Sequence, residues 1–408
     1  MAKQNKPAIR FKGFTDAWEQ RKLGEVVERI TRKNENLEST LPLTISAQYG
    51  LINQNEFFDK RIASKDVSGY FLVRNGEFAY NKSTSSDAPW GAIKRLDRYE
   101  SGVLSTLYIV FKILDERKTS SDYIVTYYNT DLWHKGIQAI AAEGARNHGL
   151  LNVAPADFFE TNLTMPKDYA EQQQIGSFFQ QLDHLITLHQ RKYDKLQVLK
   201  KAMLEKMFPK NGSSVPEIRF KGFTDAWEQR KVGELIEDYI EKTTVQNQYP
   251  VLTSSQQQGV VFQEDYFADR QVTTNDNIGY YVLPYGYFTY RSRSDTDVFI
   301  FNRNNIIDKG IISYYYPVFL PKDCDSNFLL RRLNHGIKKQ LSMAAEGTGQ
   351  KVLAHNKFKN MIVDVPEIEE QQKIGLYFES LDHLITLHQR ELEKLQNIKK
   401  SMLEKMFV

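Results

Sequence analysis

The sequence contains two copies of one pattern. Residues 10–22 read RFKGFTDAWEQRK, and residues 219–231 repeat these letters without change. The decapeptide LDHLITLHQR likewise occurs at 182–191 and again at 381–390. Internal identity over such lengths is the signature of a tandem repeat, in which each copy forms the same structural unit. The chain is therefore predicted to fold as two related halves rather than as one large domain.

Between the identical segments the two copies diverge, although their glycine and aromatic positions persist. The motif G-x-F-x-Y occurs at 76–80 and at 286–290, and AAEG occurs at 141–144 and at 344–347. One fold with two different surfaces explains this pattern. The predicted parts are a first domain (1–170), a first helix (171–208), a Pro/Gly/Ser linker (209–215), a second domain (216–369) and a second helix (370–408).

Each domain is predicted to be α+β. Short runs of β-branched and aromatic residues, bounded by Gly, Pro, Asn and Asp, indicate strands at 104–113, 279–290 and 311–320. Apolar residues spaced by three and four indicate one helix near the end of each domain, at 122–142 and at 326–345. The fold class is therefore two β-rich domains of one fold, joined by the two repeated helices.

The repeated tails contain apolar heptads without proline, and each can form a helix about 57 Å long at ~1.5 Å per residue. A helix of this length with a narrow apolar stripe needs a partner helix, and the other copy is the nearest candidate. We expect an antiparallel coiled coil with internal pseudo-twofold symmetry. Asp168 and Glu171 resemble a capping box at the first helix start. The predicted seam contains Leu182, Leu185, His189 and Leu196 of one helix, and Leu381, Leu384, His388 and Leu395 of the other.

Composition limits the environment and the chemistry. The 408 residues include one cysteine, Cys324, so no internal disulfide is possible, and a reducing, cytoplasmic location is expected. No apolar run is long enough to span a membrane. His184 and His189 lie five residues apart and point to different helix faces, so no metal site is predicted.

Two fragments resemble pieces of enzyme motifs. Residues 87–90 (DAPW) resemble the loop with which amino-methyltransferases hold a flipped base, but Ala88 replaces a proline and no glycine-rich cofactor loop precedes it. Residues 346–351 (EGTGQK) lack the spacing of a phosphate-binding loop. Both are interpreted as surface turns, and no catalytic residue is predicted.

DNA-contact candidates lie where the two halves differ. Most of them lie at or after the shared tyrosine or after the shared AAEG, where Arg, Lys, Asn and Gln are of the types that pair with guanine or adenine edges. Lys94 and Arg95 are included as a local basic cluster. For any single residue the alternative is a solvated polar loop, and Gln48 and Gln256 are weaker candidates. The candidates are Asn81, Lys82, Ser83, Lys94, Arg95, Arg146, Asn147 and His148 in the first half, and Tyr290, Arg291, Arg293, Thr348, Gln350 and Lys351 in the second.

The order R-F-x-G-F-x-D-x-W-x(4)-L/V-G-E, a variable domain, P-x(n)-E-Q-x-x-I-G and a long helix, given twice, resembles the specificity subunit of type I restriction–modification enzymes. The matching residues are 10–25 and 219–234, Pro166 with 171–176, and Pro366 with 370–375. The resemblance implies that each variable domain reads one half of a bipartite, asymmetric site in double-stranded DNA, and that the helices space the half-sites. It also implies a non-catalytic chain without a cofactor, which binds two methyltransferase subunits and two restriction subunits. These partners would use S-adenosylmethionine, ATP and Mg.

Two other readings remain open at this point: an enzyme in its own right, and a scaffold whose end domains bind proteins or glycans. The net charge of +3 is weak evidence against DNA binding, because DNA-binding domains are often strongly basic. The basic excess lies in the repeated segments, whereas both variable domains are slightly acidic. Tight DNA binding is therefore expected only in the assembled complex.

Overall fold

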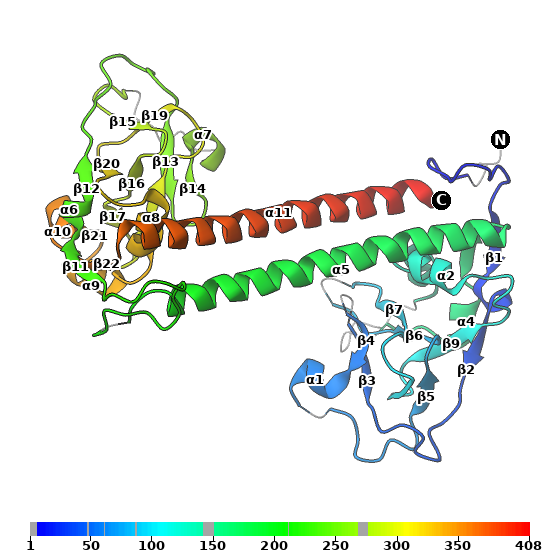
Figure 1. Cartoon of the computed structure of the whole chain (residues 1–408). Coiled ribbons are helices and arrows are strands. Elements are labelled where there is room, and N and C mark those ends of the chain that lie inside the picture. The colour runs from blue at the N-terminus through cyan, green and yellow to red at the C-terminus, as the bar shows by residue number, and fades with distance from the viewer. Residues whose placement is uncertain are drawn as a thin grey trace. The chain divides into compact units, whose positions relative to one another are not determined.

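The computed structural model describes residues 6–46, 49–60, 62–85, 88–141, 151–210, 212–267 and 276–408. They form two compact units, Met1–His189 with Glu391–Val408, and Gln190–Arg390 (Figure 1). Each unit therefore combines one β-rich domain with the first half of one long helix and the second half of the other. This division differs from the predicted one, in which each helix is a separate part, because each domain packs against segments of both helices.

In the first unit, a four-stranded antiparallel sheet has the order β2-β9-β6-β7, and three two-stranded pairs surround it, β1-β10, β3-β4 and β5-β8. The strands are β1 (Glu19–Lys22), β2 (Val27–Ile30), β3 (Leu43–Ser46), β4 (Gly50–Asn53), β5 (Phe71–Arg74), β6 (Phe78–Asn81), β7 (Ala92–Arg95), β8 (Ser101–Leu104), β9 (Ile109–Ile113) and β10 (Asn162–Met165). The helices are the 3-10 turn η1 (Leu23–Glu25), α1 (Gln54–Phe58), α2 (Ser121–Tyr127), α3 (His134–Ile140), α4 (Pro155–Phe159) and the long α5 (Tyr169–Lys206).

The second unit repeats this plan with the sheet order β12-β20-β16-β18 and the pairs β11-β22, β13-β14, β15-β19 and β17-β21. Its strands are β11 (Glu228–Lys231), β12 (Ile236–Asp238), β13 (Leu252–Ser255), β14 (Gly259–Phe262), β15 (Tyr281–Pro284), β16 (Phe288–Tyr290), β17 (Arg293–Ser294), β18 (Phe301–Arg303), β19 (Lys309–Ile312), β20 (Val318–Pro321), β21 (Lys351–Val352) and β22 (Ile362–Val365). Its helices are α6 (Val232–Leu235), α7 (Gln263–Tyr266), α8 (Ser326–Asn334), α9 (Lys338–Ala344), α10 (His355–Lys359) and the long α11 (Ile368–Met406).

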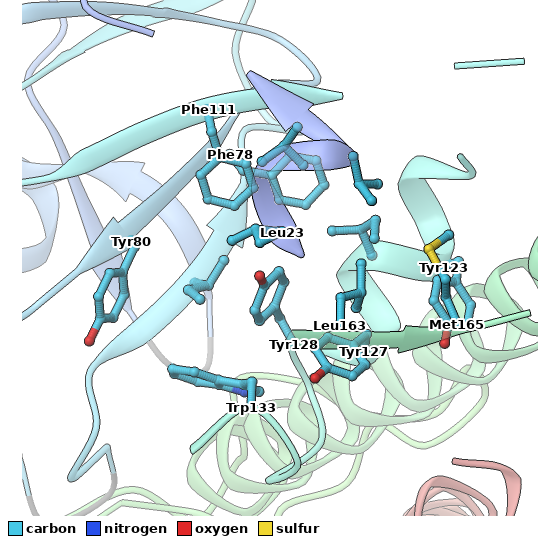
Figure 2. Packing of buried hydrophobic residues seen from close by; sticks show 14 of the residues in the cluster. Leu23, Phe78, Tyr80, Phe111, Tyr123, Tyr127, Tyr128, Trp133, Leu163 and Met165 are labelled. Atoms are coloured by element: carbon cyan, nitrogen blue, oxygen red, sulfur yellow. The ribbon is translucent and has the colours of Figure 1, made fainter. Parts of the chain in front are cut away.

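Aromatic rings fill the core of each domain, and Figure 2 shows part of the core in the first. The rings of Phe78 and Phe111 stack with centroids 5.3 Å apart, and Phe288 and Phe319 repeat the contact at 5.6 Å. The persistent aromatic positions of the sequence are thus positions where one sheet strand packs against the next. Such packing fixes the fold and leaves the loops free to vary.

The identical segments hold each long helix against its domain. The guanidinium group of Arg10 binds the buried carboxylate of Glu171 at 2.5 and 2.7 Å, and Arg219 binds Glu370 at 2.7 and 2.7 Å. A bidentate ion pair of this kind is directional as well as strong. The predicted capping box is wrong in this respect, since Glu171 binds Arg10, while Asp168 accepts a hydrogen bond from the backbone N–H of Ala170 at 2.8 Å.

The glycine of the E-Q-x-x-I-G motif allows the helix to approach its domain closely. A Cβ atom at Gly176 would lie 2.7 Å from the Cβ of Asp122, and one at Gly375 would lie 2.4 Å from Oδ1 of Asp325. Asp122 lies in the first turn of α2, and Asp325 is the N-cap residue of α8. Glycine is therefore required at this position for a steric reason, in both halves.

Within each unit the two helical segments run antiparallel. In the first unit Lys399 binds Asp183 at 2.6 Å, and in the second unit Lys200 binds Asp382 at 2.5 Å. These four residues occupy equivalent positions of the two copies. The helix pairing that the heptads predict is thus present, with one matched ion pair in each unit.

The register of the seam differs from the predicted one. Leu182, His189, Leu196, Leu381, His388 and Leu395 are buried or half-buried as expected, whereas Leu185 and Leu384 are each 41% exposed. The less exposed positions on each helix are spaced alternately by four and three residues. They include Ile186 and Ile385 in place of the two exposed leucines. The sequence offered apolar residues at both positions, and the folded chain buries the isoleucines more than the leucines.

The single helices predicted at 122–142 and 326–345 are each two short helices. In the second domain the break lies at Gly336, whose φ of +112° suits glycine and ends α8. In the first domain a polar turn separates α2 from α3, and the hydroxyl group of Thr130 donates to the carbonyl of Tyr127 at 2.7 Å. Local polar and glycine signals therefore overrode the apolar periodicity.

Candidate DNA interface

In the second domain, two candidate loops that are far apart in the sequence lie side by side. Strands β17 and β21 pair in antiparallel fashion, with Arg293 opposite Val352 and Ser294 opposite Lys351. The backbone N–H of Leu353 also donates to the carbonyl of Ser292 at 2.9 Å. The loop that follows the shared tyrosine and the loop that follows AAEG therefore form one surface.

The first domain repeats the join between these loops. The backbone N–H of Leu151 donates to the carbonyl of Lys82 at 2.9 Å, so here too the loop after the shared tyrosine is bonded to the segment that precedes the next short helix. Asn81 ends β6 and accepts a hydrogen bond from the N–H of Ser83 at 3.0 Å, while burial lowers the pKa of Lys82. Arg146, Asn147 and His148, like Gln48, lie outside the described residues.

A polar cleft of about 550 Å³ opens beside β17. Its lining includes Gln256, Gln257, Arg291, Arg293 and Asp295. The side chain of Gln256 donates to the carbonyl of Val298 at 3.1 Å. The cleft thus presents amide and guanidinium groups, which are the hydrogen-bonding groups that recognise base edges.

The residues after AAEG in the second domain are mostly solvent-accessible. Thr348 is exposed, and Gln350 and Lys351 are half-buried. The side-chain amide of Gln350 donates to Asp295 Oδ1 at 3.0 Å, so Gln350 also ties the two loops together.

Two of the predicted cations are part of the scaffold. Arg95 binds Asp97 at 2.6 Å and Asp122 at 2.8 Å, and its counterpart Arg303 makes the same kind of contacts with Asn305 and Ser326. Lys94 donates to Asn129 at 2.9 Å, and burial lowers its pKa. Asp97 is a neighbour of Arg95 in the sequence, whereas Asp122 and Asn129 are far from Arg95 and Lys94, so the sequence could not reveal these two partners. Both side chains therefore make contacts within the domain that support its fold.

Tyr290 is a core residue rather than a surface contact, which corrects its selection as a DNA-binding candidate. Its side chain is fully buried, and its hydroxyl group lies 3.2 Å from His355 Nδ1. His355 Nε2 lies 2.9 Å from Asp238, which also accepts a hydrogen bond from Lys359 at 2.7 Å. In the first domain the matching Tyr80 instead donates to the carbonyl of Trp90 at 2.9 Å. Sequence reasoning missed this network because its members are scattered along the chain.

Among the residues that the structure describes, no cluster of three or more His, Cys, Asp or Glu could hold a metal ion. In the same set, no helix has both the length and the apolar character needed to cross a membrane. The single thiol, Cys324, is half-buried, and burial raises its pKa to about 12. A thiol with this pKa is a poor nucleophile at neutral pH.

The comparisons with known proteins find specificity domains and subunits of type I restriction–modification systems. The sequence model of the family described as "Type I restriction modification DNA specificity domain" matches residues 205–397. The type I restriction enzyme MjaVIII specificity subunit of Methanocaldococcus jannaschii is 23% identical, over 95% of this chain and 91% of that protein. The crystal structure of a type I restriction–modification S subunit from M. genitalium has a TM-score of 0.59 at 14% identity, and covers 99% of both chains. At that identity the structural likeness concerns the fold.

Proposed function

We propose that this chain, a relative of the type I restriction–modification specificity subunits that carries their DNA specificity domain in residues 205–397, is a non-catalytic, sequence-specific DNA-binding subunit. Each β-rich domain reads one half of a bipartite, asymmetric site. The chain recruits methyltransferase subunits, which modify adenine with S-adenosylmethionine. Restriction subunits that use ATP and Mg complete the restricting form of the enzyme.

The observation that carries this proposal is the contrast between scaffold and loop tips. Equivalent pairs such as Arg10–Glu171 and Arg219–Glu370 hold the two domains in the same way. At the joined loops, by contrast, Asn81 and Ser83 of the first domain correspond to Arg291 and Arg293 of the second. One scaffold that presents different hydrogen-bonding groups is what reading two different half-sites requires.

The surface of the long helices supports two copies of one partner. In the identical decapeptides, Leu185 and Leu188 are 41% and 39% exposed, and Leu384 and Leu387 are 41% and 45% exposed. Each unit thus presents the same apolar pair on its helix. Because identical surfaces bind identical partners, we assign each pair to an apolar helix of one methyltransferase subunit.

The function is tested by mapping methylated adenines in cells that carry the cognate methyltransferase with or without this chain. Methylation at one bipartite motif is expected only when the chain is present. Exchange of residues 23–170 for those of a relative should change one half-site and leave the other intact. A change in both half-sites would contradict the assignment of one domain to each.

If each leucine pair binds one methyltransferase subunit, the number of bound subunits should follow the number of intact pairs. We expect two methyltransferase subunits on the native chain, and one on a variant with Leu185→Glu and Leu188→Glu. The matched variant, Leu384→Glu with Leu387→Glu, should also bind one, and the combination of all four changes should bind none. Mass measurement by light scattering after size-exclusion chromatography distinguishes these outcomes. Two bound subunits on the fourfold variant would exclude the leucine pairs as the docking surface.

The two rival functions make opposite predictions. DNA methylation by the purified chain alone would establish an enzyme. Failure of the chain to shift duplex DNA in a gel, even with its methyltransferase present, would favour a scaffold for proteins or glycans. Weak binding by the chain alone and tight binding by the complex are expected, since both variable domains are slightly acidic.

A further inference from the structure

One arginine at the polar cleft of the second domain is held on an aromatic ring. The guanidinium carbon of Arg293 lies 4.0 Å from the centroid of the Tyr315 ring. A guanidinium group that stacks on a ring keeps its N–H groups in its own plane, directed away from the ring. The ring therefore fixes the orientation of Arg293 without occupying its hydrogen-bond donors.

The protein builds this arrangement from several sides. Ser292 anchors the backbone of Tyr315, since its N–H and its hydroxyl group both donate to the Tyr315 carbonyl, at 3.2 and 2.6 Å. The backbone of Arg293 is fixed by pairing with Val352 in β17-β21. Both the cation and the ring are thus positioned before any ligand arrives, which lowers the entropic cost of binding.

Arg293 has no carboxylate partner in the described part of the chain, and neither has Arg291 at the same cleft. The nearby carboxylate of Asp295 accepts the side-chain amide of Gln350 at 3.0 Å. Other arginines of this domain are paired: Arg332 binds Asp364 at 2.9 Å, and Arg331 binds Asp382. Among the described residues, no carboxylate therefore occupies the donors of Arg293, which leaves them to an acceptor from outside this set.

The first domain lacks both members of the stack. The equivalent strands and loop bonds place Ser83 where the second domain has Arg293, and Leu107 where it has Tyr315. Leu107 is 56% exposed, and its side chain has no aromatic ring on which a cation could stack. The cation and its ring thus occur together in one domain and are absent together from the other, as expected of a functional pair.

We propose that Arg293, oriented by Tyr315, reads a guanine in the DNA half-site of the second domain. A planar fork of two N–H donors matches the O6 and N7 acceptors that guanine presents in the major groove, and a good pair of this kind discriminates by ~1–3 kcal/mol, roughly 5- to 150-fold. This inference rests on the proposed function, and it adds the base and the residue.

The test is methylated-adenine mapping with the assembled methyltransferase complex. The native second half-site should contain a G·C pair, and Arg293→Ala should relax that single position roughly tenfold or more while both half-sites otherwise persist. Arg293→Lys should also relax it, because a single ammonium group cannot make the bidentate contact. Tyr315→Leu, which introduces the residue of the first domain, should weaken the preference for the G·C pair less than Arg293→Ala does. Tyr315→Phe should leave this preference unchanged.

The controls separate the alternatives. Ser83→Ala in the first domain should leave the second half-site unaltered, and thermal unfolding of each variant shows whether it folds like the native chain. A native second half-site without a G·C pair would overturn the inference, as would Arg293→Ala with unchanged base preference or with weaker methylation at all sequences alike. In each of these cases the bipartite motif itself would survive. If the native complex methylated no motif that depends on this chain, the proposed function itself would be refuted.

Discussion

The two β-rich domains share a scaffold and differ at their loop tips. Arg95 and Arg303 make the same contacts in both, with a neighbouring side chain on their own loop and a serine at the start of the following helix. Arg293, in contrast, corresponds to Ser83. The comparison teaches that an arginine with an equivalent partner in each half supports the fold, whereas one present in a single half is a candidate for recognition. A basic residue in a loop is therefore weak evidence of DNA contact by itself.

The largest expected effect concerns the scaffold. Glu171→Ala removes the partner of Arg10, whose side chain is only 14% exposed, and should lower the free energy of unfolding by about 3 kcal/mol, since a buried charge is left unpaired. Glu370→Ala should cost about the same in the second unit, because Arg219 is buried to the same degree. Urea unfolding gives the size of each loss, and hydrogen exchange locates it in one unit.

The exposed Glu369→Ala serves as the control for these variants and should change stability little. Unequal losses for Glu171→Ala and Glu370→Ala would show that the two scaffolds are not energetically equivalent.

An intermediate effect tests the seam. Leu182→Ala and Leu381→Ala truncate buried side chains and should each cost about 2–3 kcal/mol. Leu185→Ala and Leu384→Ala remove exposed leucines and should cost less than about 0.5 kcal/mol in the isolated chain. Thermal denaturation of the four variants separates the two registers. Equal losses at Leu182 and Leu185 would restore the register predicted from the heptads.

The smallest effect is a pH dependence linked to the second domain. Burial lowers the pKa of His355 in spite of the opposing effect of Asp238, so folding disfavours the protonated imidazole. Its contribution to stability is complete above the ordinary histidine pKa of about 6.5 and is lost as the pH falls below it, because the unfolded chain then binds the proton more strongly. The first domain has Pro155 at the equivalent helix position.

His355→Gln should therefore reduce the decrease in stability between neutral and mildly acidic pH. The melting temperature, measured as a function of pH, shows this difference. His134 and His335 also have lowered pKa values, so some acid sensitivity should persist in the variant. A pH profile identical to that of the native chain would show that His355 does not contribute.

Much of the fold could be predicted from the sequence because repetition reports it directly. The G-x-F-x-Y positions mark packed strands in both domains, and the prolines and glycines mark the breaks. The site was predicted less well. Arg291 and Arg293 were selected as candidates because they differ between the halves, whereas Tyr315 was missed, since the middle tyrosine of a run of three gives no sign that it lies beside a cation.

By itself, the sequence determined the duplication, the α+β class, the long helices and the loops in which the two halves differ, because each of these depends on local pattern or on identity between copies. The tertiary structure decided which leucines face the seam, which arginines are paired and which ring supports Arg293. These outcomes depend on contacts between residues far apart in the chain, and no local pattern encodes such distances.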